Sequence, residues 1–230
     1  MDTKKSGFMI DRRRLARLID HTDVRPQSTN ADVRRLCDEA VKHGFYAVCV
    51  QPCFVRLASK LLTGYSDVKV CTVVGFPFGM NVTDVKVFEA KKAIEDGAEE
   101  LDVVMNIGMM KAGNYAYVED ELNKITDVTK GVVVKLIVET GYLTVEELGK
   151  ACDIAVRAGV DYVKTCTGFG PRGVSLEDVR LIKEFTGGKV GIKASGGIRT
   201  YEQAVSLIEA GATRIGTSHG LKLLEGAPSE

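Results

Sequence analysis

Two lysines that stand ahead of glycine loops are the residues of this chain best suited to covalent chemistry. Lys164 lies in a short strand-like run and is followed by a glycine-rich loop from Gly168, and Lys193 lies in a second such run ahead of Gly196 and Gly197. Burial disfavours the charged form of an amine, and a second ammonium nearby lowers its pKa further. Lys164 is therefore expected to be partly neutral near pH 7 and nucleophilic. The alternative is an edge-strand lysine that points to solvent.

Two carboxylates interrupt other apolar runs and could balance these lysines. Asp20 follows Leu18 and Ile19, and Asp102 lies between Leu101 and two valines. Buried charges need partners, so two acids and two bases are expected to converge in one interior. A purely structural ion-pair cluster is the alternative, but perturbed charged groups gather at functional sites.

A third pair of charges, Lys135 and Glu139, stands in one further apolar run. These two residues are expected either to take part in the chemistry or to form a supporting salt bridge at the rim of the site.

The elements that must position these side chains alternate along the chain. Strands are expected at 18–22, 45–50, 68–75, 101–106, 132–139, 162–166, 190–194 and 213–216. Helices are expected at 12–17, 31–43, 52–62, 83–96, 116–129, 144–158, 176–185 and 201–210, with a short one after Ser218. Such alternation is typical of a parallel sheet with helical crossovers.

An internal repeat narrows the fold. A helix end, a glycine and a strand recur at Gly44, Gly97, Gly159 and Gly211, about 50–60 residues apart, and each unit holds two strands and two helices. This pattern predicts an α/β fold, a (β/α)8 TIM barrel, in one domain over residues 1–230 with a short N-terminal helical lead-in. A doubly wound open sheet is less favoured, because eight units are present and no GxGxxG follows the first strand.

Glycine loops after the last two expected strands suggest a phosphate site. Gly196–Gly197 follows the seventh strand, and Gly216, Thr217 and Ser218 follow the eighth. Loops at these places of a TIM barrel often bind phosphate through backbone N–H groups. The loop from Gly168, which carries Arg172, could add a charge-assisted contact. A nucleophilic amine, a neighbouring cation, a carboxylate and an anion site are the parts of a Schiff-base lyase for a phosphorylated carbonyl compound.

The composition excludes several other classes of protein. The 230 residues carry 31 Lys and Arg against 31 Asp and Glu, and this balance gives no sign of a nucleic-acid surface. Residues 1–10 are too short and polar for a signal peptide, and no apolar run reaches the ~20 residues of a membrane span. The cysteines are expected to be reduced core residues of a cytoplasmic protein: Cys37, Cys49, Cys53, Cys71, Cys152 and Cys166. The three histidines form no ligand motif, so neither a metal nor another cofactor is expected.

The motifs around these residues resemble the deoxyribose-phosphate aldolase family of class I, metal-free aldolases. The resemblance runs from residues 18–22 to 214–218, through the motifs GFPFG at 75–79, VKVFEA at 85–90, ELDVVMNIG at 100–108, VKLIVET at 134–140, YVKTCTGFG at 162–170 and IKASGGIRT at 192–200. It implies reversible cleavage of 2-deoxy-D-ribose 5-phosphate to D-glyceraldehyde 3-phosphate and acetaldehyde, in a homodimer or homotetramer.

The resemblance also implies roles for single residues. Lys164 would form the Schiff base, Lys193 would depress its pKa, Asp102 would relay protons with a water, and Asp20 would support the lysine network. The phosphate would lie against Gly196, Gly197, Gly216, Thr217 and Ser218, with Gly168 and Arg172 nearby.

Three departures from the family pattern stand out. His219 replaces the second serine of the last phosphate loop and would weaken phosphate binding or add a titratable contact. Phe78 and Met80 replace Leu and Ala, which we expect to be a packing change. The chain ends without the tyrosine that assists proton transfer in some members, so proton exchange at the acetaldehyde carbon is expected to be slower.

Two alternatives remain open beside this reading. A different lysine Schiff-base aldolase, such as a 2-keto-3-deoxy sugar-acid aldolase or a transaldolase, would use pyruvate or a ketose as the donor. A phosphosugar-binding barrel without catalysis would be stabilised by ligand but would not turn it over.

Overall fold

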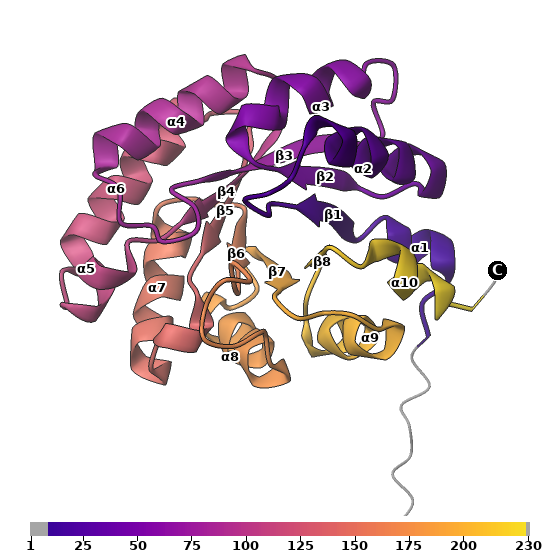
Figure 1. The fold of residues 1–230 in the computed structure, drawn as a ribbon. Coiled ribbons are helices and arrows are strands. Elements are labelled where there is room, and N and C mark those ends of the chain that lie inside the picture. The colour runs from indigo at the N-terminus through magenta and orange to yellow at the C-terminus, as the bar shows by residue number, and fades with distance from the viewer. Residues whose placement is uncertain (1–8, 229–230) are drawn as a thin grey trace, which may run out of the picture.

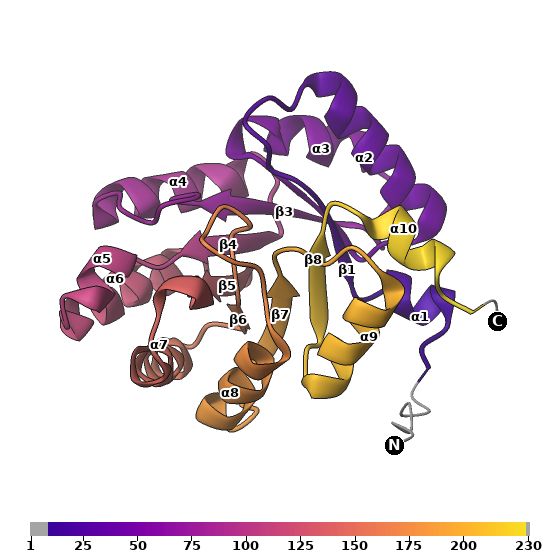
Figure 2. The ribbon, with the colours of Figure 1, turned by 60° about the horizontal axis from the view of Figure 1, so that its bottom comes forward.

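Eight parallel strands form a closed barrel in the computed structural model, which describes residues 9–228, and neighbouring strands pair in sequence order from β1 round to β8 and back to β1. The strands are β1 (Ile19–Asp23), β2 (Ala47–Val50), β3 (Lys69–Val74), β4 (Glu100–Val104), β5 (Val133–Ile137), β6 (Tyr162–Lys164), β7 (Gly191–Ser195) and β8 (Arg214–Thr217). Helices surround them on the outside, as Figures 1 and 2 show. The predicted (β/α)8 fold is confirmed.

The helices follow the strands in the predicted alternation. They are α1 (Arg12–Ala16), α2 (Asn30–His43), η1 (Pro52–Phe54), α3 (Val55–Leu61), α4 (Thr83–Glu95), α5 (Ile107–Lys111), α6 (Tyr115–Val128), η2 (Thr140–Tyr142), α7 (Val145–Arg157), α8 (Leu176–Thr186), α9 (Tyr201–Ala210) and α10 (Gly220–Glu225). The sequence did not predict α5 or η2, because helices this short do not show a repeating pattern of apolar residues. The side chain of Asn106 begins α5 by accepting from the Met109 N–H at 3.1 Å.

Local capping fixes where the longer helices begin. Thr144 and Glu147 form the predicted capping box of α7, with 3.2 Å from the Glu147 N–H to the threonine oxygen and 2.7 Å from the Thr144 N–H to the carboxylate. Thr29 and Asp32 form the same motif at α2, which ends at Gly44 in the left-handed conformation. These caps satisfy N–H groups that a helix leaves without partners.

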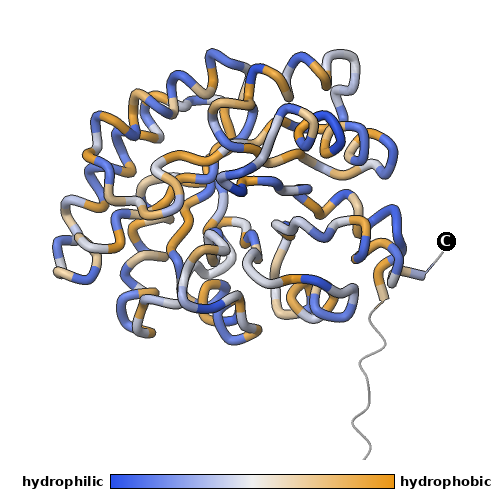
Figure 3. Tube along the Cα trace, viewed as in Figure 1, coloured by the Kyte–Doolittle hydropathy of each residue, from blue (hydrophilic) through white to orange (hydrophobic). Residues whose placement is uncertain are grey.

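The barrel separates an apolar outer layer from a partly charged interior. Outward side chains of the strands, among them Val48, Leu101 and Leu136, pack against the helices in one large core. Figure 3 shows orange and blue segments alternating along the helices around it. Inward positions of β2 and β3 form a small apolar cluster with Ala47, Cys49, Cys71 and Val73. Inward positions of β1 and of β4 to β8 carry the charges of the site.

Both described ends of the chain lie on the same side of the barrel, where α1 and α10 are neighbours (Figure 2). The Arg12 N–H donates to the Pro228 carbonyl at 3.3 Å. The expected absence of a signal peptide concerns residues 1–10, of which 1–8 lie outside the described part, and the end of the C-terminal tail, 229–230, lies outside it too. A single domain over 1–230 stays a prediction.

Two further expectations concern the cysteines and the membrane. All six cysteines are unpaired, and five are buried as predicted, but Cys53 is exposed in η1 and is not a core residue. Among the described residues, no helix combines the length and the apolar character that crossing a membrane requires.

Candidate active site

The carboxylate of Asp102 is the centre of a buried charge network inside the barrel. One oxygen, Oδ2, accepts from Lys164 Nζ at 2.7 Å and from Lys193 Nζ at 2.6 Å, and the other, Oδ1, accepts from Lys135 Nζ at 2.9 Å. Asp102, Lys135 and Lys193 are fully buried, whereas Lys164 is 4 % exposed. The structure thus brings together both lysines and the acid that the sequence singled out, and places Lys135 beside them.

A second layer of charges lies below Asp102, toward the N-terminal ends of the strands. The Asp20 carboxylate contacts Lys193 Nζ at 2.5 Å and Arg214 at 2.8 Å. Glu100 contacts Lys135 at 2.6 Å and Arg214 at 3.1 Å. Asp20 therefore lies within 4 Å of three cations of the network, since Lys135 Nζ is 3.8 Å from it as well.

Strand register explains why these charges meet. Lys164 of β6 is in register with Lys193 of β7, and Lys193 is in register with Arg214 of β8. Asp102 of β4 is opposite Lys135 of β5. In-register residues of neighbouring parallel strands point to the same face, so all five side chains enter the barrel interior.

The network perturbs the protonation of its members. Burial would raise the pKa of Asp102, but Lys135, Lys164 and Lys193 outweigh it and hold that pKa well below its usual range. The same competition, won by Lys193, Lys135 and Arg214, lowers the pKa of Asp20 to about 2. Both carboxylates are therefore ionised at neutral pH.

Carboxylates give the two fully buried lysines of this centre, Lys135 and Lys193, a raised pKa. Burial disfavours the ammonium of Lys193, but Asp102 and Asp20 outweigh burial and raise its pKa. Lys135 behaves in the same way, with Asp102 the strongest of its anionic neighbours. Neighbouring Lys135 lowers the pKa of Lys193, as expected for like charges, but the two carboxylates within hydrogen-bond distance of Lys193 outweigh this effect.

A count of formal charges leaves one cation in excess. Four basic groups, Lys135, Lys164, Lys193 and Arg214, meet three carboxylates, Asp20, Glu100 and Asp102. Lys135, Lys193 and Arg214 each contact two or more carboxylates, whereas the ion pair of Lys164 is with Asp102 alone. Loss of a proton from Lys164 would bring the network to neutrality.

A cavity of about 260 Å³ opens above the network at the C-terminal ends of the strands, and Lys164 is the one member of the network that lines it. The predicted loop residues line it as well: Gly168, Gly196, Gly197, Gly216, Thr217 and Ser218. Gly196 and Gly197 have positive φ values of 101° and 80°, which residues with a Cβ rarely adopt. The amine and the glycine loops thus share one cavity, at the place where TIM barrels hold their active sites.

Basic and hydroxyl side chains complete the wall of this cavity. Arg25, Arg199 and His219 line it beside Thr22 and Thr167. His219 Nδ1 is 3.1 Å from Ser218 Oγ, so the residue that replaces the usual serine reaches the same loop. The sequence did not single out Thr22, Arg25, Thr167 or Arg199, although all of them except Arg25 lie within the motifs that resemble the family.

Arg172 is not among the residues that line the cavity. Its guanidinium donates to both oxygens of Asp178, at 2.6 and 2.8 Å, and to the carbonyls of Gly173 and Thr140. The structure therefore places Arg172 at the start of α8, where it holds the loop against the helix.

Two overlapping groups of buried side chains have donor atoms of the kind that bind metals. In each group the donor atoms lie within 4.8 Å of one another, and the groups are Cys49, Cys71 and Asp102, and Asp20, Cys71 and Glu100. A metal needs the thiols deprotonated. Burial and a hydrogen bond with Cys49 raise the pKa of Cys71, and both oxygens of Asp102 already accept from ammonium groups. These residues therefore fit a cation network of lysines better than a bound metal ion.

The sequence matches a known family over nearly its whole length. Residues 9–226 match the DeoC/LacD family aldolase. The chain belongs to this aldolase family. A deoxyribose-phosphate aldolase of Thermococcus kodakarensis is 54% identical over 224 residues, which are 96% of this chain and 100% of that one. Another, of Carboxydothermus hydrogenoformans, is 50% identical over 96% of this chain and 98% of its own.

A solved structure agrees with the barrel of this aldolase. The tetrameric deoxyribose phosphate aldolase from Aeropyrum pernix superposes with a TM-score of 0.87 at 38% identity, covering 93% of this chain and 90% of that one. The (β/α)8 architecture and the family resemblance predicted from sequence are both confirmed.

Proposed function

We propose that this aldolase cleaves 2-deoxy-D-ribose 5-phosphate reversibly to D-glyceraldehyde 3-phosphate and acetaldehyde through an imine on Lys164. The observation that carries the proposal is the position of Lys164, which alone joins the buried network to the cavity lined by the glycine loops. The relatives at 54% and 50% identity carry the name of this activity.

The first half of the reaction builds the imine. Unprotonated Lys164 Nζ attacks the C1 aldehyde carbon of the open-chain sugar, and the carbonyl oxygen takes up a proton to give a carbinolamine. Loss of water then leaves a protonated imine. Asp102, 2.7 Å from Nζ and ionised, accepts and returns the protons of these steps, and Lys193 beside it keeps the carboxylate oriented.

The second half breaks the bond between C2 and C3. The C3 hydroxyl loses its proton, the C2–C3 electron pair moves into the imine, and D-glyceraldehyde 3-phosphate leaves with the C3 oxygen as its aldehyde. The enamine that stays on Lys164 is protonated at C2, and water releases acetaldehyde from the resulting imine. The positive imine nitrogen acts as the electron sink, which Asp102 stabilises from below.

The phosphate end of the substrate would lie against the glycine loops. Gly196, Gly197 and Gly216–Ser218 line the cavity and would present backbone N–H groups to the phosphate oxygens. Arg199 of the same wall would supply positive charge, and His219 would take the place of the usual serine. Arg25 lies in this wall too, but Asp23 accepts from its guanidinium at 2.9 and 2.7 Å and partly neutralises it. Arg172 has no part in this proposal, because Asp178 holds its guanidinium.

Two further features belong to the proposal. We infer a homo-oligomer, a dimer or a tetramer, since the relative from Aeropyrum pernix is tetrameric. A cytoplasmic location stays a prediction, supported by the unpaired cysteines.

Borohydride trapping tests the reaction and its nucleophile together. The protein is incubated with 2-deoxyribose 5-phosphate, reduced, digested and searched by mass spectrometry for an adduct on Lys164. Lys164→Ala should keep its circular dichroism spectrum and lose both adduct and turnover, because a cavity at the barrel mouth is tolerated better than one in the packed core. Turnover by Lys164→Ala within tenfold of the parent would rule out this assignment. Thermal stabilisation by substrate without any adduct would indicate a binding barrel, and an adduct with pyruvate instead would indicate a different donor.

A further inference from the structure

Glu139, just after β5, is held in an unusual backbone conformation. Its φ of 54° and ψ of 68° are left-handed, and it is the one residue other than glycine with positive φ in the described range 9–228. Such a conformation costs about 1–3 kcal/mol and persists where the surroundings enforce it, often at functional sites. The residue is also buried, at 1 % exposed.

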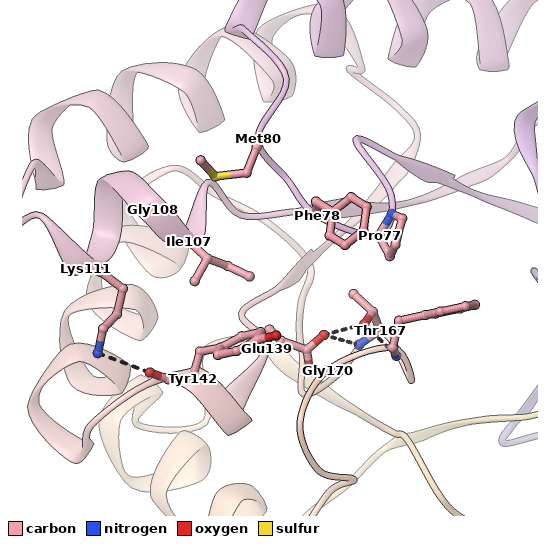
Figure 4. A pocket seen from close by; sticks show the side chains of 11 residues that line it. Pro77, Phe78, Met80, Ile107, Gly108, Lys111, Glu139, Tyr142, Thr167 and Gly170 are labelled. Carbon is pink, nitrogen blue, oxygen red and sulfur yellow. Dashed lines mark hydrogen bonds between the residues drawn. The ribbon is translucent and has the colours of Figure 1, made fainter.

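The side chain of Glu139 accepts hydrogen bonds from one residue, Thr167. Oε2 accepts from the Thr167 N–H at 2.9 Å and from the Thr167 hydroxyl, as the dashed lines of Figure 4 show. Gly170 packs directly on the carboxylate, since a Cβ there would be 2.6 Å from Cδ. Oε1 has no hydrogen-bond partner among the described residues. A buried carboxylate held in this way must be fixed by the loop after β6.

The consequence of this contact is the hydrogen-bond polarity of Thr167. A threonine hydroxyl has one proton to donate and two lone pairs that accept. The proton is committed to Glu139, and one lone pair accepts from the Phe169 N–H at 3.0 Å. What remains is a single acceptor position, on a residue that lines the catalytic cavity beside Lys164.

We propose that Glu139 is a positioning residue that fixes Thr167 as a hydrogen-bond acceptor, so that the site selects a substrate with a hydroxyl on the carbon next to the reacting carbon. The inference rests on the proposed function. The hydroxyl concerned is that on C4 of the sugar phosphate, which becomes the C2 hydroxyl of D-glyceraldehyde 3-phosphate. It can donate to Thr167 before and after cleavage, whereas the C3 oxygen becomes a carbonyl and loses its proton.

The experiment compares two acceptor aldehydes in the synthetic direction with acetaldehyde. D-glyceraldehyde 3-phosphate carries the hydroxyl, and 3-oxopropyl phosphate lacks it but keeps the aldehyde and the phosphate. The measured quantity is the ratio of their kcat/KM values. The parent should favour the hydroxylated acceptor about tenfold or more, the factor expected for one hydrogen bond to an otherwise unpaired partner.

Four variants separate positioning from general stability. Thr167→Val keeps the volume but removes the hydroxyl, so it should bring the ratio close to one. Glu139→Leu lets the threonine hydroxyl rotate, so that its acceptor position is no longer fixed toward the substrate, and the ratio should fall in the same direction. Thr167→Ser and Glu139→Gln should keep most of the preference, because the amide oxygen of glutamine can accept from the same N–H and hydroxyl. Glu146→Gln, an exposed carboxylate in the first turn of α7, is the matched control and should leave the ratio unchanged.

A merely structural role of Glu139 would slow both acceptors alike and leave the ratio intact, and that result would overturn the inference. Loss of the preference in Thr167→Val but not in Glu139→Leu would also overturn it. If Glu139→Leu does not fold, Glu139→Asp, which draws the carboxylate back by one methylene, replaces it with the same expected loss. Failure of the parent to use either acceptor would refute the proposed function itself, and this inference with it.

Discussion

Replacing Lys135 by methionine is the sharpest test of the charge network, because it removes a cation that never reaches the substrate. Lys135 is fully buried and contacts Asp102 at 2.9 Å and Glu100 at 2.6 Å. In its absence three cations would meet three carboxylates, and the network would be neutral with Lys164 protonated. The variant should therefore be less active than the parent at a pH where the parent is active.

The size of the effect follows from the geometry. Lys135 and Lys164 bond opposite oxygens of Asp102, at 2.9 and 2.7 Å, so their nitrogens are roughly 5–6 Å apart. Two unit charges at that separation repel by about 3 kcal/mol at an effective dielectric constant of about 20, which corresponds to about two pH units. Since the lost neighbour is positive, the rising limb of the activity profile is expected to move to higher pH.

The assay is kcat/KM for cleavage of 2-deoxyribose 5-phosphate from pH 5 to 10. The parent is compared with Lys135→Met, and with Lys124→Met as a surface control whose ion pair with Asp120 is exposed. Breaking the buried pairs should also cost about 3–5 kcal/mol of unfolding free energy, so the circular dichroism spectrum is checked at each pH. A folded Lys135→Met protein with the parent's pH profile would refute the charge-balance reasoning. Lys193→Leu should move the profile in the same direction and provides a second test.

Two further predictions concern stability and the role of a loop arginine. The pKa of Asp20 is about 2 in the fold against an ordinary 3.8, so its ionised carboxylate contributes about 2 kcal/mol to the unfolding free energy above pH 4, and this contribution is lost as the pH falls through 2. In urea unfolding, the free energy of Asp20→Asn should therefore decline less over this pH range than that of the parent. An equal decline in both proteins would contradict the shift. Arg172→Ala should lower the unfolding free energy by about 1 kcal/mol through the lost ion pair with Asp178 and leave KM for the sugar phosphate almost unchanged. A large rise of KM with unchanged stability would show instead that Arg172 binds the phosphate.

The sequence could predict those charges that stand out against apolar strands. Asp20, Asp102, Lys164 and Lys193 each interrupt such a run, and the structure gathers all four within one network. The alternation of elements was enough to predict the barrel, since each strand needs a helix to return the chain.

The partners at the strand starts could not be predicted in this way. Glu100 and Arg214 are the first residues of β4 and β8. In a sequence, a charged residue at the start of a strand cannot be told from one in the preceding loop or at the rim of the barrel. Only the register of the closed barrel shows that they meet inside it. Phe78 and Met80, expected to be packing changes, are 75 % and 60 % exposed at the rim of a second cavity, because their loop turns outward after β3.

In this network, the residues that hold the buried charges differ from the one lysine that is placed to react. Buried ion pairs seldom add stability over well-packed apolar residues, so a network of seven charged groups is hard to explain by stability alone. Lys193 and Arg214 stand in register beside Lys164, yet carboxylates on both layers hold them charged and away from the cavity. The result is one amine, surrounded by fixed positive charge, at the only point where the network meets the cavity lined by the glycine loops in the described part of the chain. Such a pattern presents one lysine to the substrate, and it does so through groups that never touch the substrate.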